Sequence, residues 1–424
     1  MKTNSLKHRV ISVLLAVALS AISSMSLYGA ARPSRPVRDT RVPLAASHFA
    51  KGQSALGIPF ALSNNIILIQ AKVNNSRPLW FMFDTGANSS VINTGLVKEL
   101  NLTLGARVQG KAAGGNVEAE VISGVSLSIG GAIASNQTIA ALPLDVFSAA
   151  LGKPIAGIIG YDFIKQFVVE VDYAAKVMRL YRPTNFKRPV KGEILPITFI
   201  NRKPFVKAKI KLAGRDPIEG TFMIDTASDG VMGVNAPFVK TQQMLNSVSN
   251  GRQTNSAGAG GVSKSIVARV QNIQLNGFII NNPLVEFSLA TEGNDTISSY
   301  QGLLGGEVFR RFTMTIDYSR QRIILKRNRY FDEPVEVDMS GIDLMAEPDD
   351  FKTLVVNEVA AGSPAAVADV KEEDQLLEVD GRPVSEIGLD QVRQWFKQNG
   401  KEQLLTIKRG GQVLHVKIKL SRSI

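Results

Sequence analysis

The residues best suited to chemistry in this chain are two aspartates in matching surroundings. Asp84 lies within residues 81–87, which read FMFDTGA, and Asp225 lies within residues 222–228, which read FMIDTAS. Each acid follows three apolar residues that are expected to end a buried strand. An aspartate in such a place is unfavourable unless its carboxyl group is hydrogen-bonded or paired. We therefore expect the two carboxyl groups to meet.

Two neighbouring carboxyl groups could hydrolyse a peptide bond. They cannot both ionise easily, so Asp84 and Asp225 are expected to share one proton. One carboxylate then takes a proton from a bound water molecule, which attacks a peptide carbonyl group. The other carboxyl group protonates the carbonyl oxygen, and the roles reverse as the amine leaves. The loop residues expected to support this pair are Thr85, Gly86, Ala87, Thr226, Ala227 and Ser228.

The two aspartate loops differ in a way that predicts unequal acids. Thr85 and Thr226 are expected to bond to backbone groups of the opposite loop. Ser228 has a hydroxyl group where the first loop has an alanine. A hydroxyl group that donates to a carboxylate lowers the pKa of that acid. The sequence therefore predicts that Asp225 carries the charge and that Asp84 holds the proton.

The scarcity of other reactive side chains excludes several classes of enzyme. Cysteine is absent, which rules out thiol nucleophiles, disulfide bonds and cysteine-rich zinc sites. Histidine occurs only at positions 8, 48 and 415, so a Ser-His-Asp triad or a multi-histidine metal centre has almost no residues to draw on. The formal net charge of +12 is diffuse beyond the N-terminus, and no basic face with stacking aromatics is seen. We expect no metal, no cofactor and no nucleic-acid partner.

An internal repeat positions the two acids. The motif around Asp84 returns 141 residues later, GIIG at 157–160 returns as GLLG at 302–305, and Gly114-Gly115 returns as Gly260-Gly261. Most segments between the turns read as short strands. Two copies in one chain predict a mainly β, bilobal protein with a pseudo-twofold axis, a dimer within a monomer. The expected lobes span residues 58–183 and 184–330.

The first residues read as an export signal. Basic residues precede an apolar stretch from Val10 to Ile22, and small residues follow. We expect a signal peptide over residues 1–31 and a solvated linker over residues 32–57. An uncleaved leader would instead anchor the chain in a membrane. The prediction is an exported protein, either periplasmic or secreted.

The two Asp-Thr-Gly-like motifs and the later glycine segments resemble the aspartic peptidases of the pepsin and retropepsin superfamily, over residues 58 to 330. The resemblance implies closed, barrel-like lobes and an endopeptidase that needs no cofactor. It also implies that Gly115 and Gly261 lie in flap-like hairpins over the substrate, although ordinary hairpin glycines read the same way. Ala227 departs from the family pattern, which has glycine there.

The last part of the chain, residues 340–424, is richer in charge and reads as a separate α+β domain. GSPAA at 362–366 and the segment 374–381 resemble the PDZ domains of bacterial exported peptidases. The resemblance implies capture of an extended peptide by strand addition. The expected groove strand is Leu354-Val355-Val356. The acidic residues around Asp350 argue against capture of a terminal carboxylate, so internal peptide binding or packing against the lobes stays open.

Two functions are compatible with these features. The first is an aspartic endopeptidase that cleaves exported or envelope proteins and uses its PDZ domain for peptide recognition or regulation. The second is a non-catalytic scaffold that holds peptides in a degenerate cleft. The duplicated acids favour the enzyme, and Ala227 keeps the scaffold open.

Overall fold

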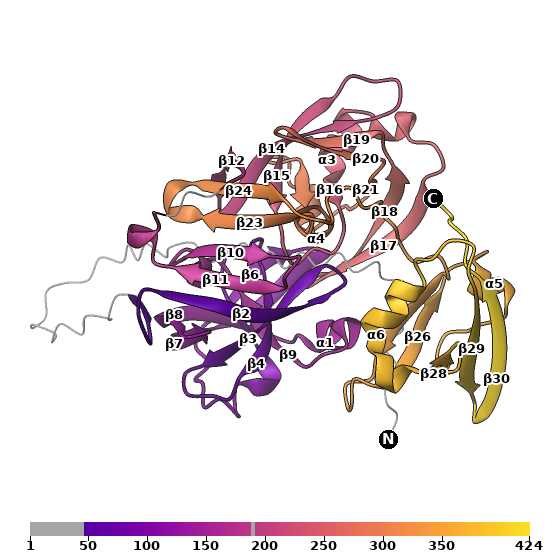
Figure 1. The fold of residues 1–424 in the computed structure, drawn as a ribbon, viewed down its shortest axis with the longest axis horizontal. Helices are drawn as coiled ribbons and strands as arrows, with labels where there is room; N and C mark the ends of the chain where they lie inside the picture. Colours follow the sequence, from indigo (N-terminus) through magenta and orange to yellow (C-terminus); the bar gives the residue numbers. More distant parts are fainter. Residues whose placement is uncertain (1–45, 188–190) are drawn as a thin grey trace, which may run out of the picture.

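The computed structural model describes residues 46–187 and 191–424, which form two β-rich lobes and a smaller C-terminal domain (Figure 1). The predicted signal peptide lies outside the described residues. The linker predicted over residues 32–57 is wrong in its second half, because strand β1 (Ala46–Phe49) pairs with β8 (Ala132–Leu142) and β2 starts at Ser54. Phe49 packs on Phe167 at 5.4 Å between ring centroids, which anchors this segment to the first lobe.

Lobe 1 is a sheet whose central strands are buried on both faces. Ile66 to Ile69 at the start of β3 are all buried, as expected for an apolar run without alternation. Strands β4 and β9 run parallel, and β5 lies antiparallel to β9. The remaining elements are β2 (Ser54–Ser63), β3 (Ile66–Val73), β4 (Leu79–Phe83), β5 (Val91–Asn93), η1 (Thr94–Leu96), β6 (Arg107–Ala112), β7 (Gly115–Ile129), α1 (Asp145–Leu151), β9 (Ile155–Ile159), α2 (Tyr161–Ile164), β10 (Val168–Asp172), β11 (Val177–Tyr181) and η2 (Pro183–Asn185).

Lobe 2 repeats this arrangement. Strand β15 runs parallel to β22, and β16 lies antiparallel to β22. Its elements are β12 (Glu193–Pro196), β13 (Thr198–Ile200), β14 (Lys203–Lys211), β15 (Ile218–Ile224), β16 (Met232–Val234), α3 (Ala236–Thr241), η3 (Met244–Ser247), β17 (Arg252–Gly258), β18 (Gly261–Arg269), β19 (Asn272–Leu275), β20 (Phe278–Asn281), β21 (Leu284–Ser288), η4 (Asn294–Thr296), β22 (Gly302–Leu304), α4 (Gly306–Phe309), β23 (Phe312–Asp317), η5 (Tyr318–Arg320) and β24 (Arg322–Arg327).

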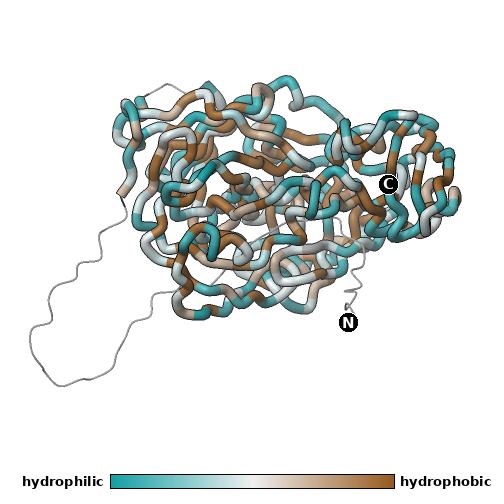
Figure 2. Tube along the Cα trace, turned by 90° about the horizontal axis from the view of Figure 1, so that it is seen from below, coloured by the Kyte–Doolittle hydropathy of each residue, from teal (hydrophilic) through white to brown (hydrophobic). Residues whose placement is uncertain are grey.

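A sheet with strands from both lobes joins the two copies. Strand β10 of lobe 1 pairs antiparallel with β23 of lobe 2, and the strand order β12-β24-β23-β10-β11-β2 crosses the boundary (Figure 1). The largest hydrophobic cluster also spans both lobes and contains Phe83 and Ile224, which precede the two aspartates. Hydrophilic residues gather on the outer turns (Figure 2). The predicted mainly β, bilobal fold is therefore confirmed.

The C-terminal domain has its own core and lies beside helix α1 of lobe 1 (Figure 1). Its sheet has the order β25-β26-β27-β29-β30, and the backbone of α6 breaks at Gly388, where φ is 77°. The elements are β25 (Ile342–Ala346), β26 (Leu354–Val359), α5 (Pro364–Val367), β27 (Gln375–Val379), β28 (Arg382–Pro383), α6 (Val384–Trp395), β29 (Glu402–Arg409) and β30 (Gln412–Lys419).

Candidate active site

The two aspartates occupy equivalent places at the ends of central strands. Asp84 follows β4, and its backbone N–H donates to Ile159 O at 2.9 Å. Asp225 follows β15, and its backbone N–H donates to Leu304 O at the same distance. These acceptors belong to the two glycine segments found in the repeat. The β-ladders therefore continue up to each acid and hold both loops in one geometry.

The threonines join the two loops across the pseudo-twofold axis. Thr85 Oγ1 donates to Ile224 O at 2.7 Å, and Thr226 Oγ1 donates to Phe83 O at 2.7 Å. Each hydroxyl oxygen also accepts the backbone N–H of the opposite threonine, at 3.1 and 3.2 Å. Neither loop can shift without breaking bonds to the other, so the lobes form the site jointly.

The two carboxyl groups lie together in an enclosed place. Both side chains have 0% exposure. Asp84 Oδ1 accepts the N–H groups of Gly86 and Ala87 at 2.7 and 3.0 Å, and Asp225 Oδ1 accepts that of Ala227 at 3.0 Å. The Asp225 carboxyl group lies against the first loop, since a Cβ atom on Gly86 would stand 2.8 Å from Asp225 Oδ2. No N–H or hydroxyl donor in the described part of the chain reaches either Oδ2, so these atoms remain for the shared proton and for water.

Burial makes the two acids weak and unequal. It raises the pKa of Asp84 well above its ordinary value, and the nearby charge of Asp225 raises it further. Burial raises the pKa of Asp225 to about 6, opposed by hydrogen bonds from the backbone N–H of Ala227 and from Asp84. The pKa of Asp84 is thus the more strongly raised of the two. The order matches the expectation, but its reason does not, because Ser228 Oγ has no hydrogen-bond partner among the described residues.

Two hairpins meet above the carboxyl pair. The turn between β6 and β7 carries Gly114 and Gly115, and the turn between β17 and β18 carries Gly260 and Gly261. Gly260 N–H donates to Ala113 O at 2.8 Å. A Cβ atom on Gly114 would stand 2.0 Å from Gly261 O, so a side chain is excluded there. Gly115 and Gly261 thus lie in hairpins that touch each other tip to tip.

A small cavity opens beneath the hairpin tips on the lobe 2 side. It holds about 30 Å³ of free space, room for one water molecule. Glu286 and Asp295 line it together with several serines. Burial raises the pKa of Glu286 to about 7, and the hydroxyl groups of Ser256 and Ser265 oppose this shift. The sequence did not indicate this polar recess.

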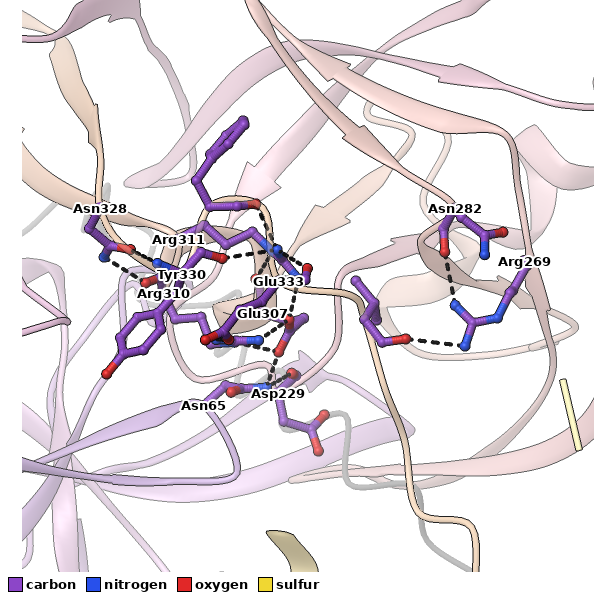
Figure 3. Close-up of polar contacts among 12 residues, drawn as sticks. Asn65, Asp229, Arg269, Asn282, Glu307, Arg310, Arg311, Asn328, Tyr330 and Glu333 are labelled. Carbon is purple, nitrogen blue, oxygen red and sulfur yellow. Dashed lines mark hydrogen bonds and ion pairs between the residues drawn. The ribbon is translucent and has the colours of Figure 1, made fainter. Parts of the chain in front are cut away.

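A polar junction beneath the pair was also missed. Asn65 of lobe 1 donates to Asp229 O and to Glu307 Oε2, both at 2.9 Å (Figure 3). Asn64 Nδ2 donates to Asp229 Oδ2. Asp229 ends the second aspartate loop, so the turn before β3 braces that loop from the other lobe. In the sequence, the only feature that could have indicated this contact is the pair Asn64-Asn65 directly before an apolar strand.

The expected PDZ groove strand needs correction. Leu354-Val355-Val356 lies in β26, which pairs with β25 on one side and with β27 on the other, so its backbone is not free for an added strand. The edge strands of this sheet are β25, beside β26, and β30 at the opposite side. The acidic segment around Asp350 connects β25 to β26, where Asp350 Oδ1 accepts two backbone N–H groups of its own turn. It is a hairpin turn and not a ligand loop.

The free edge of β25 faces lobe 1. Helix α1 packs against β25, and Met345 contacts the hydrophobic cluster of lobe 1. Arg393 of α6 donates to Leu344 O in β25 at 2.8 Å and to Ala150 O in α1 at 2.7 Å. Ser63 Oγ donates to Asp390 Oδ1 at 2.7 Å. The β25 edge of the sheet is therefore covered by lobe 1.

Two β lobes that each contribute one aspartate to a buried carboxyl pair define the fold class of the aspartic peptidases. An aspartyl protease family model matches residues 69–163, and a PDZ domain model matches residues 355–409. The chain therefore carries an aspartyl protease domain and a C-terminal PDZ domain. The first match contains Asp84 and ends before lobe 2. No curated protein matches the chain.

Two searches of the described residues gave negative results. Within residues 46–187 and 191–424 no helix is long and apolar enough to cross a bilayer. In the same ranges no group of three His, Cys, Asp or Glu side chains could hold a metal ion.

Proposed function

We propose that this protein is an aspartic endopeptidase that hydrolyses peptide bonds with water activated between Asp84 and Asp225. The observation that carries the proposal is the buried, hydrogen-bonded carboxyl pair with unequal acids. Such a pair carries one proton over a range of pH, which is the state that acid–base hydrolysis needs. A carboxyl pair buried without this use would cost stability.

The pKa order assigns the roles. Asp225, the stronger acid, is ionised and takes a proton from the attacking water. Asp84 holds its proton and donates it toward the carbonyl oxygen. The new amine then leaves with the proton that Asp225 received, and Asp84 regains its own. The hairpin tips must part to admit an extended peptide and close again before the chemistry.

The test is digestion of unfolded casein by the full chain at several pH values. We expect cleavage by the wild type, and loss of cleavage in Asp84→Asn and in Asp225→Asn. Asp172→Asn is the matched control, since Asp172 caps an exposed turn by accepting Ala175 N–H at 3.0 Å. A wild type inert at every pH would favour the alternative, a peptide-binding scaffold with a degenerate cleft.

We also propose that the substrates are exported or envelope proteins. The support is the signal-like leader, residues 1–31. The PDZ domain supports recognition of a peptide or protein partner. Expression of the full chain in a bacterial host, followed by cell fractionation and intact mass, tests the location. An unprocessed chain in the cytoplasm would overturn it.

A further inference from the structure

Lys203 is a buried cation in the wall of the active site. It is the first residue of β14 and has only 3% exposure. Within the described residues its ammonium group makes no hydrogen bond, and no carboxylate oxygen lies within 4.0 Å of it. A buried lysine without a close partner costs stability, so Lys203 does not serve the folding of lobe 2 in the way that an apolar side chain at this place would.

The register of β14 directs this side chain toward the cleft. Side chains two residues apart in a strand share a face, so Lys203 lies on the face of Phe205. Phe205 packs with Met223, Leu303 and Ala113, and Ala113 belongs to the hairpin tip of lobe 1. Farther along the same face, Lys207 is exposed and pairs with Glu219 at 3.1 Å. Lys203, at the start of the strand, has no such partner among the described residues.

The pseudo-twofold partner of Lys203 is an isoleucine. Strand β3 starts at Ile66 after two residues with positive φ, Asn64 and Asn65, and β14 starts at Lys203 after the same turn at Asn201-Arg202. Ile66 has 0% exposure and lies in the cluster that contains Ala87 of the first aspartate loop. One side of the carboxyl pair is thus flanked by a hydrocarbon side chain and the other by a cation.

The charges of Lys203 and of the carboxyl pair act on each other. Burial lowers the pKa of Lys203 to about 8, while the charges of Asp225 and Asp84 oppose that shift. In return, the charge of Lys203 lowers the pKa of both aspartates. The other titratable groups near the pair are Tyr300, whose pKa is raised by burial and by Asp295 and Asp225, and Tyr318, whose pKa is raised by burial and by Asp84. Both tyrosines are neutral at physiological pH, so within residues 46–187 and 191–424 the cation that acts on the pair is Lys203.

We propose that Lys203 is a positioning residue that holds one negative charge on the carboxyl pair and so sets the pH range in which the pair has a single proton. This inference rests on the proposed function of the same site. The cation favours each ionised form, so its removal raises the pKa of both acids and moves the whole active range toward higher pH.

The experiment is the pH profile of kcat/KM of the full chain on casein for Lys203→Ile and Lys203→Arg. The first variant installs the residue of the other lobe, and we expect its acidic limb to move up by about one pH unit, the size expected of a charge beyond contact distance in a partly screened site. The second keeps the charge and should stay near the wild-type limb. Lys207→Ile, on the same strand face, is the control and should leave the profile unchanged.

Three outcomes would overturn the proposal. The first is a Lys203→Ile profile that superimposes on that of the wild type. The second is an equal loss of kcat at every pH with Lys203→Ile, which indicates a structural role. The third is a higher KM with no shift of the limb, which indicates contact with an acidic substrate side chain. Thermal unfolding of each variant verifies folding, and Lys203→Met replaces a variant that does not fold.

A second readout separates this inference from the proposed function. The carboxyl carbons of Asp84 and Asp225 can be titrated by carbon NMR in the full chain, with Asp84→Asn and Asp225→Asn for assignment. We expect both midpoints to rise in Lys203→Ile. If casein is never cleaved, the proposed function fails, while this titration still decides whether Lys203 acts on the pair.

Discussion

Gly86 and Ala227 occupy equivalent positions in the two aspartate loops, yet a methyl group has different consequences there. A Cβ atom on Gly86 would stand 2.8 Å from Asp225 Oδ2, inside contact distance. Ala227 already carries its methyl group, is fully buried, and still donates its N–H to Asp225. The departure from the family pattern at Ala227 therefore leaves the carboxyl hydrogen bond in place.

The close approach at Gly86 gives the first prediction. Gly86→Ala should lower kcat by roughly tenfold or more, since displacing Asp225 costs about 1–3 kcal/mol of the kind seen on overpacking. The measurement is kcat on casein beside the melting temperature. Gly95→Ala is the control, because a Cβ atom there would meet Asn93 Oδ1 at an ordinary 3.6 Å. Equal rates for Gly86→Ala and the wild type would contradict the packing argument.

Glu286 gives a prediction about stability and pH. Burial raises its folded pKa from 4.5 to about 7, so the folded chain binds this proton more tightly than the unfolded chain does. Its stabilising contribution is complete below about pH 4.5 and is lost as pH rises to about 7, a fall of roughly 3 kcal/mol in unfolding free energy. Denaturant unfolding across this range should show the fall, and Glu286→Gln should reduce it by the share that Glu286 contributes, while the other buried acids with raised pKa values keep theirs. Glu219→Gln, at an exposed acid, should leave it as in the wild type.

At the same scale, the sequence predicts the acids but not their surroundings. Asp84 and Asp225 are predictable because each sits in a motif that the repeat duplicates. The repeat does not reveal Lys203, because its equivalent in lobe 1 is a different residue type, Ile66. The two positions are 137 residues apart, whereas the two aspartates are 141 residues apart. The loop between the strands differs in length, so the offset changes, and only the matching turns at Asn64 and Asn201 reveal the correspondence.

At the scale of elements, side chains of the short helix α4 and of the residues after it contact both the Asn65 turn of lobe 1 and the segment that follows β24 (Figure 3). Glu307 bonds to Asn65 of the other lobe, to Arg310 at 2.7 Å and to Arg311 at 2.7 Å. Arg311 has 1% exposure, and its guanidinium group also donates to the carbonyl oxygens of Tyr330, Phe331 and Glu333. Arg311 thus holds three carbonyl groups of the segment that leads to the PDZ domain. In the same view, Arg269 donates to Asn282 O at 2.9 Å.

The third prediction concerns the replacement of Arg311. Arg311→Met should reduce the unfolding free energy by roughly 2–4 kcal/mol, because it removes the guanidinium donor of three carbonyl groups and one of the two arginines that pair with the buried Glu307. Denaturant unfolding of the full chain measures this. Arg77→Met, which breaks an exposed ion pair with Glu99 at 3.4 Å, should change the value by less than about 1 kcal/mol. Equal effects of the two substitutions would refute the role assigned to Arg311.

The elements also show where pattern reasoning fails. The alternation in β26 identifies a strand correctly, but whether a strand lies inside a sheet or at its edge depends on partners far away in the chain. Leu354-Val355-Val356 lies inside because β27 returns to pair with it. The linker prediction fails for a related reason, since β1 is ordered by pairing with β8, a strand more than eighty residues later.

On the scale of the whole molecule, the PDZ domain is docked through its sheet edge and helix α6. A Cβ atom on Gly152, at the end of α1, would stand 3.4 Å from Leu389 Cβ in α6. Disulfide bonds join Cβ atoms about 3.5–4.5 Å apart. The fourth prediction is therefore that Gly152→Cys combined with Leu389→Cys forms a disulfide on oxidation. The absence of native cysteine leaves no competing thiol.

The cross-link is measured by mass and by mobility with and without reductant. Each single cysteine variant is a control and should show no intramolecular bond. A double variant that stays fully reduced would mean that the PDZ domain is not held against α1 in solution.

The threonine bonds across the axis have a consequence for the newly made chain. Asp84 is complete in the first half of the sequence, but its loop is anchored to Ile224 O and to Thr226 of the second half. A ribosome-bound or half-translocated chain therefore has one acid and no partner for it. The carboxyl pair can therefore form only after synthesis has passed lobe 2, which makes its assembly a late event in the production of the chain.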